Sequence, residues 1–367
     1  MRVRIVSVVG TRPQVIKAAA LSPALRARHV DLFVDTGQHY DAAMAGSFFA
    51  ELSLPPPDVS LAVGSGTHAE QTARMLRGVE EVLERERPAA VLVYGDTNST
   101  LAGTLAAVKL GLPVAHVEAG LRSFDRSMPE EINRLVSDHL SSWRFAPTPT
   151  AVANLAAEGL REGVELVGDL MQDLAARLSP EVRDPGVLVA TPAGPLEPGR
   201  YLFATIHRAE NREPAAVRAW CRLLSEVARP DRPVVLALHP GTRAAMDRVE
   251  ASPGPDVRIT EPLGYRTSLA LQLHAAAVLT DSGGVQREAA WLRVPCLVLR
   301  RTTEWIEAVE ASAGRMAVIG LDASAARLEL ERLAPMASTP AMAAERAASL
   351  DLQPAGAAEA IAAALDR

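Results

Sequence analysis

The stretch DSGGVQREA, Asp281 to Ala289, joins the apolar run AAAVLT to a helical pattern, and its residue types fit a phosphate-containing ligand. Ser282, Gly283 and Gly284 would place backbone amides at the start of a helix, where free N–H groups and the helix dipole attract anions. Glu288, one helical turn later, could accept hydrogen bonds from both hydroxyls of a ribose. A strand-to-helix turn alone needs at most one glycine, so the pair favours a diphosphate site.

A second candidate phosphate site lies in VVGTRPQVIKAA, where Arg12 and Lys17 follow a turn between the first strand and the first helix. Main-chain amides at this turn and two cations would suit a negatively charged group. The alternative is an ordinary turn with solvated bases. The segment lacks the G-x-G-x-x-G fingerprint, so it gives no support for NAD binding.

Three carboxylates are candidates for acid–base chemistry. Asp96 in VYGDTNST and Glu118 in HVEAGLRSF end neighbouring strand patterns, and Glu130 in MPEEINR begins a helix. Acidic residues at a helix start also favour the helix dipole, which is the structural alternative for Glu130 and Glu131. Carboxylates gathered at one edge would separate one another's pKa values, which suits proton transfer.

Two histidines, each followed by an arginine, end consecutive strand patterns: His207 with Arg208, and His239 with Arg243. This repetition suits an anionic ligand, and the absence of an H-x-x-H spacing disfavours zinc. The glycine-rich VGSGTHAEQT has a different interpretation. There, Thr67 and Glu70 form a capping box at a helix start, which we favour over a phosphate cradle.

These clusters require elements that hold them at strand ends. Short apolar runs alternate with helical patterns throughout, which predicts two doubly wound, Rossmann-like α/β domains whose strand ends line a cleft. We expect the first domain to span residues 1–168 and the second residues 169–350, with a Pro- and Gly-rich stretch after residue 178. The alanine-rich tail, 340–366, predicts one or two helices.

Composition excludes several functional classes. With 367 residues and a net charge of −6, the chain has no electrostatic case for binding nucleic acid or an acidic membrane surface. It shows no signal-peptide pattern and no long apolar run, so we expect a soluble, cytoplasmic protein. Cys221 and Cys296 are expected to be buried, reduced thiols. Of the 38 lysines and arginines only Lys17 and Lys109 are lysines, which makes the position of Lys17 in a motif informative.

Together the motifs resemble those of the non-hydrolysing UDP-N-acetylglucosamine 2-epimerases, in the family's order, from about residue 3 to residue 320. They are GTRPQVIKAA, TGQHYD, GDTNSTLAG, HVEAGLRSF, PEEINR, HRAEN, TDSGGVQREA and TTEWIEAVEA. The resemblance implies two Rossmann-like domains of the GT-B type, with a last helix, 351–367, crossing back to the first domain. It also implies a homodimer with no metal or redox cofactor.

The resemblance further implies a reaction: inversion of C2 of a UDP-2-acetamido sugar, UDP-GlcNAc to UDP-ManNAc, through elimination of UDP to a 2-acetamidoglucal and its re-addition. By resemblance, Asp96, Glu118 and Glu130 transfer protons, and His207 meets the substrate near the phosphates. The residues expected to bind the substrate are Arg12, Lys17, Gln38, His39, Arg208, His239, Ser282, Gly283, Gly284, Glu288 and Arg300.

Some positions depart from the pattern of many family members. Gln14 stands where many have Glu, TEWIE replaces TERPE at Glu304 to Glu307, and Ala209 follows HR. These features resemble the branch that includes UDP-2,3-diacetamido-2,3-dideoxyglucuronate 2-epimerases, which leaves that substrate as an alternative. A GT-B glycosyltransferase and a non-catalytic sugar-nucleotide sensor remain as alternatives from other classes.

Overall fold

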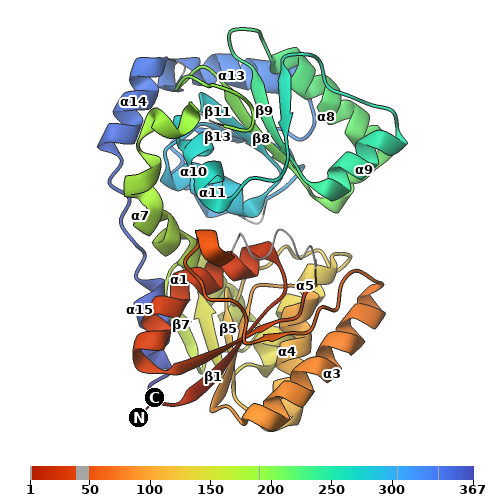
Figure 1. The fold of residues 1–367 in the computed structure, drawn as a ribbon, viewed down its shortest axis with the longest axis vertical. Helices are drawn as coiled ribbons and strands as arrows, with labels where there is room; N and C mark the ends of the chain where they lie inside the picture. The colour runs from red at the N-terminus through yellow and green to blue at the C-terminus, as the bar shows by residue number, and fades with distance from the viewer. Residues whose placement is uncertain (1, 39–48, 190, 304, 338) are drawn as a thin grey trace. The chain divides into compact units, whose positions relative to one another are not determined.

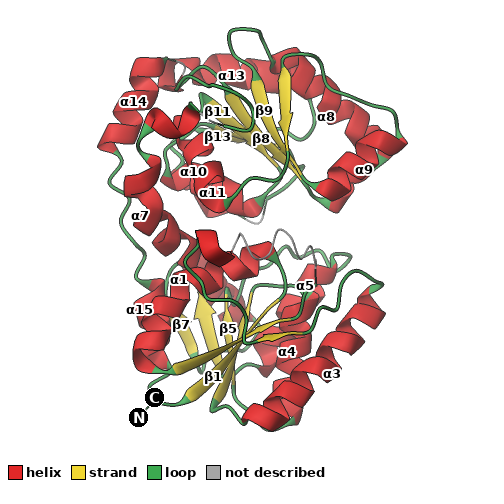
Figure 2. Cartoon of the chain, viewed as in Figure 1, coloured by secondary structure: helices red, strands yellow, loops and turns green. Residues whose placement is uncertain are grey.

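The computed structural model describes residues 2–38, 49–189, 191–303, 305–337 and 339–367. The chain divides into two compact units, one formed by Met1–Leu174 with Gln353–Arg367 and the other by Ala175–Leu352. In each unit a parallel sheet is flanked by helices (Figures 1 and 2). Two doubly wound, Rossmann-like units were predicted, and this fold class is confirmed.

The sheet of the first unit has the strand order β3-β2-β1-β4-β5-β6-β7, and every neighbouring pair is parallel. Its strands are β1 (Arg4–Val9), β2 (Val30–Asp35), β3 (Val59–Ser60), β4 (Ala90–Tyr94), β5 (Val114–Val117), β6 (Trp143–Ala146) and β7 (Val164–Leu166). The order reverses between β1 and β4. Ligands of open α/β sheets bind at the carboxyl ends of strands beside such a reversal.

The helices of the first unit are α1 (Arg12–Arg28), α3 (His68–Glu86), α4 (Asn98–Lys109), α5 (Pro129–Leu140), α6 (Pro149–Ala157) and α15 (Ala357–Ala364). All five residues of β4 are buried because helices cover both faces of the sheet, which explains its continuous apolar sequence AVLVY. The C-terminal helix α15 packs against α1 (Figure 1), and Arg28 forms an ion pair with Asp366.

The second unit repeats this architecture with the order β10-β9-β8-β11-β12-β13. Its strands are β8 (Leu202–Ile206), β9 (Val234–Leu238), β10 (Val257–Thr260), β11 (Ala277–Thr280), β12 (Cys296–Val298) and β13 (Met316–Val318). Its helices are η1 (Pro185–Leu188), η2 (Ala209–Arg212), α8 (Pro214–Val227), α9 (Pro240–Arg248), α10 (Tyr265–His274), α11 (Gly283–Trp291), α12 (Ile306–Ala311), α13 (Ala323–Ala337) and α14 (Pro340–Ser349), while α7 (Leu170–Val182) spans the boundary between the units. Here the reversal lies between β8 and β11.

Local predictions can be compared with this structure. Thr67 accepts a hydrogen bond from the Glu70 amide at the start of α3, so the capping box predicted there is confirmed. The two-residue strand β3 was not predicted, because it is too short to produce a pattern of its own. The tail forms two helices, α14 and α15, as expected. Among the described residues, no helix has the length and apolarity needed to cross a membrane.

Candidate functional site

The turn from β1 to α1 brings Arg12 and Lys17 to the carboxyl edge of the first sheet. Gly10 is required there, because a Cβ atom would lie 2.0 Å from Thr36 Oγ1 and 2.2 Å from Ser99 Oγ. The buried side chain of Gln14 holds the turn: its oxygen accepts from the Gly10 amide at 2.9 Å and from the Thr11 amide at 3.2 Å. Its nitrogen donates to the Tyr94 carbonyl at 2.7 Å, which ties the end of β1 to the end of β4.

Lys17 is buried and forms an ion pair with Glu118, the residue that follows β5. Gly95 lies against this pair, since a Cβ atom there would come within 3.4 Å of both charged groups. Glu118 has a φ of +69°, a left-handed conformation that costs a non-glycine residue about 1–3 kcal/mol. The surrounding contacts therefore hold the carboxylate in a position that its own backbone does not favour.

Asp96 follows β4 and forms an ion pair with Arg134 of α5, while 34% of its side chain remains exposed. Burial raises the pKa of Asp96 above its ordinary value, and the carboxylates of Glu118 and Glu130 raise it further, against the opposing charges of Arg134 and Lys17. The three predicted acid–base residues therefore act on one another electrostatically. A carboxyl group with a raised pKa is suited to exchange a proton.

Neighbouring Glu130 and Glu131 take different roles at the start of α5. Glu131 is buried and accepts from the backbone amides of Ser123 and Phe124 and from Arg134. It supports the loop after β5 and orients Arg134. Glu130 is half-buried. Both residues lie in the first turn of α5, where an acidic side chain favours the helix dipole. This alternative accounts for Glu131 only in part, because its carboxylate also binds the amides of the loop after β5.

Gln38 lies at the same edge as the β1–α1 turn, and its side-chain oxygen accepts from the amide and hydroxyl of Ser99. This contact joins the end of β2 to the start of α4. His39, predicted to bind substrate, lies outside the described residues, as does Glu304.

In the second unit, His207 follows β8 and Asp281 follows β11, on either side of the reversal in strand order. Asp281 is fully buried and accepts from the backbone amides of His207 and Arg208 and from the Asn211 side chain, at 2.8–3.1 Å. Burial lowers the pKa of His207, Arg208 and Arg212 lower it further, and Asp281 opposes them. The lowered pKa favours the neutral imidazole.

The predicted diphosphate loop has the expected local structure. Ser282 caps α11, with its hydroxyl accepting from the Val285 amide, and Gly283 and Gly284 are the first two helical residues. Their N–H groups lie at a helix start, where no preceding turn supplies acceptors. Glu288 is buried and accepts from Gln272 Nε2 at 2.6 Å, so this hydrogen bond fixes its orientation.

The remaining candidates of the second unit gather at this edge. The ring centroids of His207 and His239 lie 6.5 Å apart, and the Arg212 guanidinium donates to the backbone carbonyl of His207. His239 caps α9 by accepting from the Gly241 amide. Arg300 follows β12, is buried, and lies 3.6 Å from Glu210.

The profile of the UDP-N-acetylglucosamine 2-epimerase family matches residues 24–365. The chain belongs to this family. It is 43% identical over 316 residues to the UDP-2,3-diacetamido-2,3-dideoxy-D-glucuronate 2-epimerase of Pseudomonas aeruginosa, covering 84% of this chain and 87% of that relative. It is 42% identical over 317 residues to the UDP-N-acetylglucosamine 2-epimerase of Methanocaldococcus jannaschii, covering 83% and 86%.

A solved structure gives the same result. The crystal structure of the Methanocaldococcus jannaschii UDP-GlcNAc 2-epimerase in complex with UDP-GlcNAc and UDP matches with a TM-score of 0.83 and 36% identity, over 100% of this chain and 99% of that one. The family resemblance drawn from the motifs is confirmed.

Several residues near the carboxyl edges of the two sheets were not predicted as candidates. Arg134, Asp281 and His116 all lie inside quoted motifs, yet they act by contacting other protein groups. The role of Asp281 could have been inferred from its position, because an acidic residue directly after a buried strand requires hydrogen-bond partners. Gln14, noted as a departure, has a physical explanation: an ionised glutamate could not donate to the Tyr94 carbonyl.

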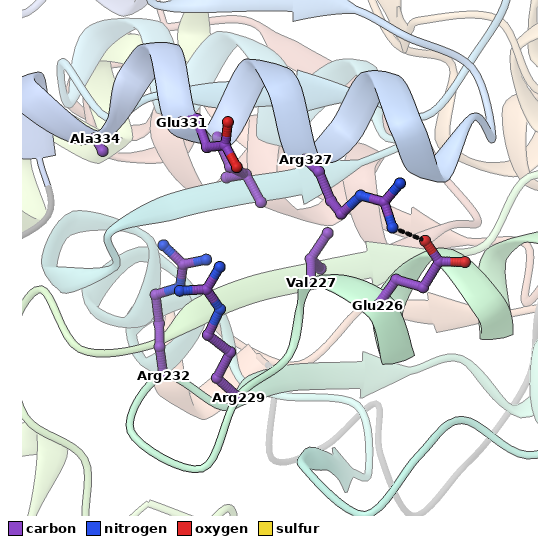
Figure 3. Close-up of a pocket in the computed structure, with 8 residues that line it drawn as sticks. Glu226, Val227, Arg229, Arg232, Arg327, Glu331 and Ala334 are labelled. Carbon is purple, nitrogen blue, oxygen red and sulfur yellow. Dashed lines mark hydrogen bonds and ion pairs between the residues drawn. The ribbon is translucent and has the colours of Figure 1, made fainter.

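Figure 3 shows a pocket in a different part of the second unit. It is lined by Glu226, Val227, Arg229, Arg232, Arg327, Leu330, Glu331 and Ala334, and Arg327 pairs with Glu226 at 2.6 Å. These residues lie at the end of α8, before β9 and along α13, at the edge opposite to His207 and Ser282. None of the predicted site residues lines it.

The two cysteines and the possible metal ligands give no indication of further chemistry in the described residues. Cys221 and Cys296 are buried, as expected, and burial raises the pKa of Cys221 to about 11 and that of Cys296 to about 12. Within the described ranges, no group of three or more His, Cys, Asp or Glu residues could hold a metal ion.

Proposed function

We propose that this chain inverts C2 of a UDP-2-acetamido sugar, converting UDP-GlcNAc to UDP-ManNAc. The observation that supports it most strongly is the cluster of Asp96, Glu118 and Lys17 at the carboxyl edge of the first sheet, with the raised pKa of Asp96. Family membership indicates a sugar nucleotide as the substrate, and the cluster offers side chains that can exchange protons.

The chemistry follows from the acidity of the C2 hydrogen. No carbonyl group neighbours C2, so direct removal of its proton at neutral pH would be too slow. Cleavage of the C1–O bond sends the bonding electrons to UDP and makes C1 cationic. A carboxylate then takes the C2 proton, and the C2–H electrons form the C1=C2 bond of a 2-acetamidoglucal.

The reverse steps complete the inversion. A UDP oxygen attacks C1, the double bond takes a proton at the opposite face of C2, and a carboxyl group supplies that proton. We assign the proton transfers to Asp96, Glu118 and Glu130. Lys17 would keep Glu118 ionised before the proton moves, because a nearby cation favours the carboxylate.

The second unit would stabilise the departing UDP. The amides at Gly283 and Gly284, the α11 dipole and Arg300 offer positive charge to the diphosphate, and Glu288 offers a carboxylate to the ribose. Neutral His207 can donate a hydrogen bond to the leaving oxygen. Arg12, Gln38, His39, Arg208 and His239 are proposed as further contacts to the substrate.

The alternative substrate is UDP-2,3-diacetamido-2,3-dideoxyglucuronate, because relatives of 43% and 42% identity carry the two different names. The test is to incubate the protein with each nucleotide and to follow the C2 epimer by proton NMR. We expect an epimer from UDP-GlcNAc. An epimer from the diacetamido-uronate alone would reassign the substrate, and transfer of the sugar to an acceptor would contradict epimerisation.

We also propose that the protein works as a homodimer, as the family resemblance implies. Light scattering after size-exclusion chromatography should give the mass of two chains. The mass of one chain under assay conditions would contradict it.

A further inference from the structure

Four titratable side chains, three of them buried and the fourth, Glu158, half-buried, form a row beneath the turns that carry Asp96 and Glu118. His116 of β5 and Asp138 of α5 are fully buried, and His116 Nδ1 lies 2.7 Å from Asp138 Oδ1. Asp138 Oδ2 lies 2.7 Å from Arg122, whose guanidinium also contacts both oxygens of Glu158 at 2.6 and 2.8 Å. Fully buried charges are rare unless they are paired, so this row requires an explanation.

The hydrogen-bond partners determine where the protons of His116 lie. Its Nε2 is 2.7 Å from the Gly95 carbonyl oxygen, which can only accept, so Nε2 carries a hydrogen. Asp138 Oδ2 accepts from the Gly120 amide at 3.0 Å and from the Arg122 guanidinium, contacts that hold this group as a carboxylate. Since the ionised Asp138 has no hydrogen to give, Nδ1 also donates.

We propose that His116 positions the acid–base residues of the reaction by donating from both ring nitrogens, an inference that rests on the proposed function. One ring nitrogen holds the carbonyl of Gly95, the residue before Asp96. The other holds Asp138, which in turn holds the amide of Gly120, two residues after Glu118. His116 thus joins the two turns from which the carboxylates project, without touching the substrate.

Strain at Glu118 gives such a clamp a purpose. Glu118 has a φ of +69°, which is unfavourable for a residue with a Cβ atom, whereas Gly95 and Gly120 adopt φ values of +63° and +82° without strain. A Cβ atom at Gly120 would lie 2.3 Å from the Ala151 carbonyl oxygen, so the turn also has no space to relax. A strained conformation persists only where its surroundings determine it strongly.

The other charged groups around His116 are compatible with a cation. Arg122 is matched by Glu158, and Arg144 donates to the backbone carbonyls of Asp138 and Glu162. The Asp138 carboxylate is therefore available to neutralise His116, and the row of His116, Asp138, Arg122 and Glu158 has no net charge. A neutral core histidine would instead leave one ring nitrogen facing an acceptor without a hydrogen.

The ionisation state can be read directly from the wild-type chain by nitrogen NMR of labelled histidine. We expect His116 to show a hydrogen on both ring nitrogens, because each of them faces an acceptor. A single neutral tautomer at neutral pH would overturn the proposal. This spectrum does not depend on turnover, so a chain without epimerase activity would refute the proposed function and still report on His116.

Two variants test the positioning role. His116→Gln keeps a donor near the Gly95 carbonyl, and His116→Asn keeps one near Asp138. We expect kcat to fall about 100-fold in His116→Asn and about 10-fold in His116→Gln, with KM and UDP affinity unchanged, because small misplacements of catalytic groups have effects of this size. His29, which is buried before β2 at the opposite edge of the sheet, provides the control, and His29→Gln should retain the wild-type kcat.

The outcome pattern separates positioning from a structural role. Folded variants with the wild-type kcat would overturn the proposal, as would equal losses of kcat and UDP affinity. If neither variant folds, the nitrogen spectrum of the wild-type chain decides the question.

Discussion

The two units share one topology, yet the carboxyl edges of their sheets carry different chemistry. At the reversal between β1 and β4, charged side chains pair with one another: Lys17 with Glu118, and Asp96 with Arg134. At the reversal between β8 and β11, the acidic residue Asp281 is directed inward onto backbone amides. The fold determines where a site forms, and the residue after each strand determines what that site does.

This difference suggests a division of labour. In our proposal the first unit contains the groups that move protons, and Glu118 and Glu130 raise the pKa of Asp96. The second unit offers backbone amides, a neutral imidazole and arginines, which suit a diphosphate that is held and released. Changes in the first unit should therefore affect turnover, and changes in the second should affect UDP binding.

The largest effect is expected from Asp96→Asn. Removing a group that exchanges protons should lower kcat about 1,000-fold, or about 4 kcal/mol in the barrier. UDP affinity, measured by calorimetry, should stay within about threefold, because the proposed diphosphate contacts belong to the second unit. Exposed Glu84 on α3 provides a matched control, and Glu84→Gln should be silent. A large loss of UDP affinity in Asp96→Asn would remove the contrast between the units.

Gly120→Ala tests the strain in the first edge. A Cβ atom would meet the Ala151 carbonyl at 2.3 Å in a left-handed backbone, so we expect a loss of about 3 kcal/mol in local unfolding free energy. Gly111 has a similar φ of +70° but no heavy atom within 4 Å, so Gly111→Ala should cost only about 1 kcal/mol. Hydrogen exchange of the β5 amides measures both. Equal losses would mean that the close contact is unimportant.

Asp281→Asn tests the second edge. An amide would place an NH2 group where Oδ1 accepts from the His207 amide, and it would remove the negative charge that strengthens the bonds from His207, Arg208 and Asn211. We therefore expect a loss of about 2 kcal/mol in stability and a weakening of UDP binding by about tenfold. Substrate that does bind should still exchange its C2 hydrogen. Asp247→Asn, on the exposed surface of α9, is the control. Loss of exchange with normal UDP affinity would assign Asp281 to the proton transfers instead.

The smallest effect is a difference in pH dependence. Burial lowers the pKa of His274 below 6.5, with Arg346 also lowering it and the hydrogen bond to Val182 and the charge of Asp184 opposing. The unfolded chain then binds more protons as pH falls below about 6.5, so the second unit should lose stability on acidification. In the first unit, burial raises the pKa values of Asp31, Asp35 and Asp96, which gives the opposite sign. The pKa values of Glu131 and Asp138 are lowered from 4.5 and 3.8, so these two groups reduce stability only at a pH more acidic than about 5.5.

Hydrogen exchange corrected for its intrinsic rate, at about pH 7 and about pH 5.5, would compare the two units. His274→Gln keeps a donor for the Val182 carbonyl and should reduce the acid sensitivity of the second unit. Parallel losses in both units would contradict the assigned signs.

The sequence predicted the fold well, for a physical reason. Strands buried on both faces read as continuous apolar runs, and a carboxylate or histidine directly after such a run is visible at once. Asp96, Glu118 and His207 became candidates in this way, and each of them directly follows a strand or lies within two residues of its end. The strand β3 has only two residues and could not be found from its pattern.

The partners of these residues could not be predicted. Lys17 and Glu118 are 101 residues apart, and nothing local indicates that they pair. The direction in which a side chain points could not be predicted either. Glu130 and Glu131 are neighbours, yet it is Glu131 that accepts hydrogen bonds from the loop amides. Whether Asp281 faces a ligand or the backbone also depends on contacts from distant segments.

The central claim is that carboxylates of the first unit remove and return the hydrogen at C2. The most direct test is to incubate the wild-type protein with UDP-GlcNAc in heavy water and to examine the product by NMR and mass spectrometry. Our account predicts one deuterium at C2 of the epimer, and almost no deuterated epimer when Asp96→Asn replaces the wild type. An epimer that keeps its original C2 hydrogen would contradict it.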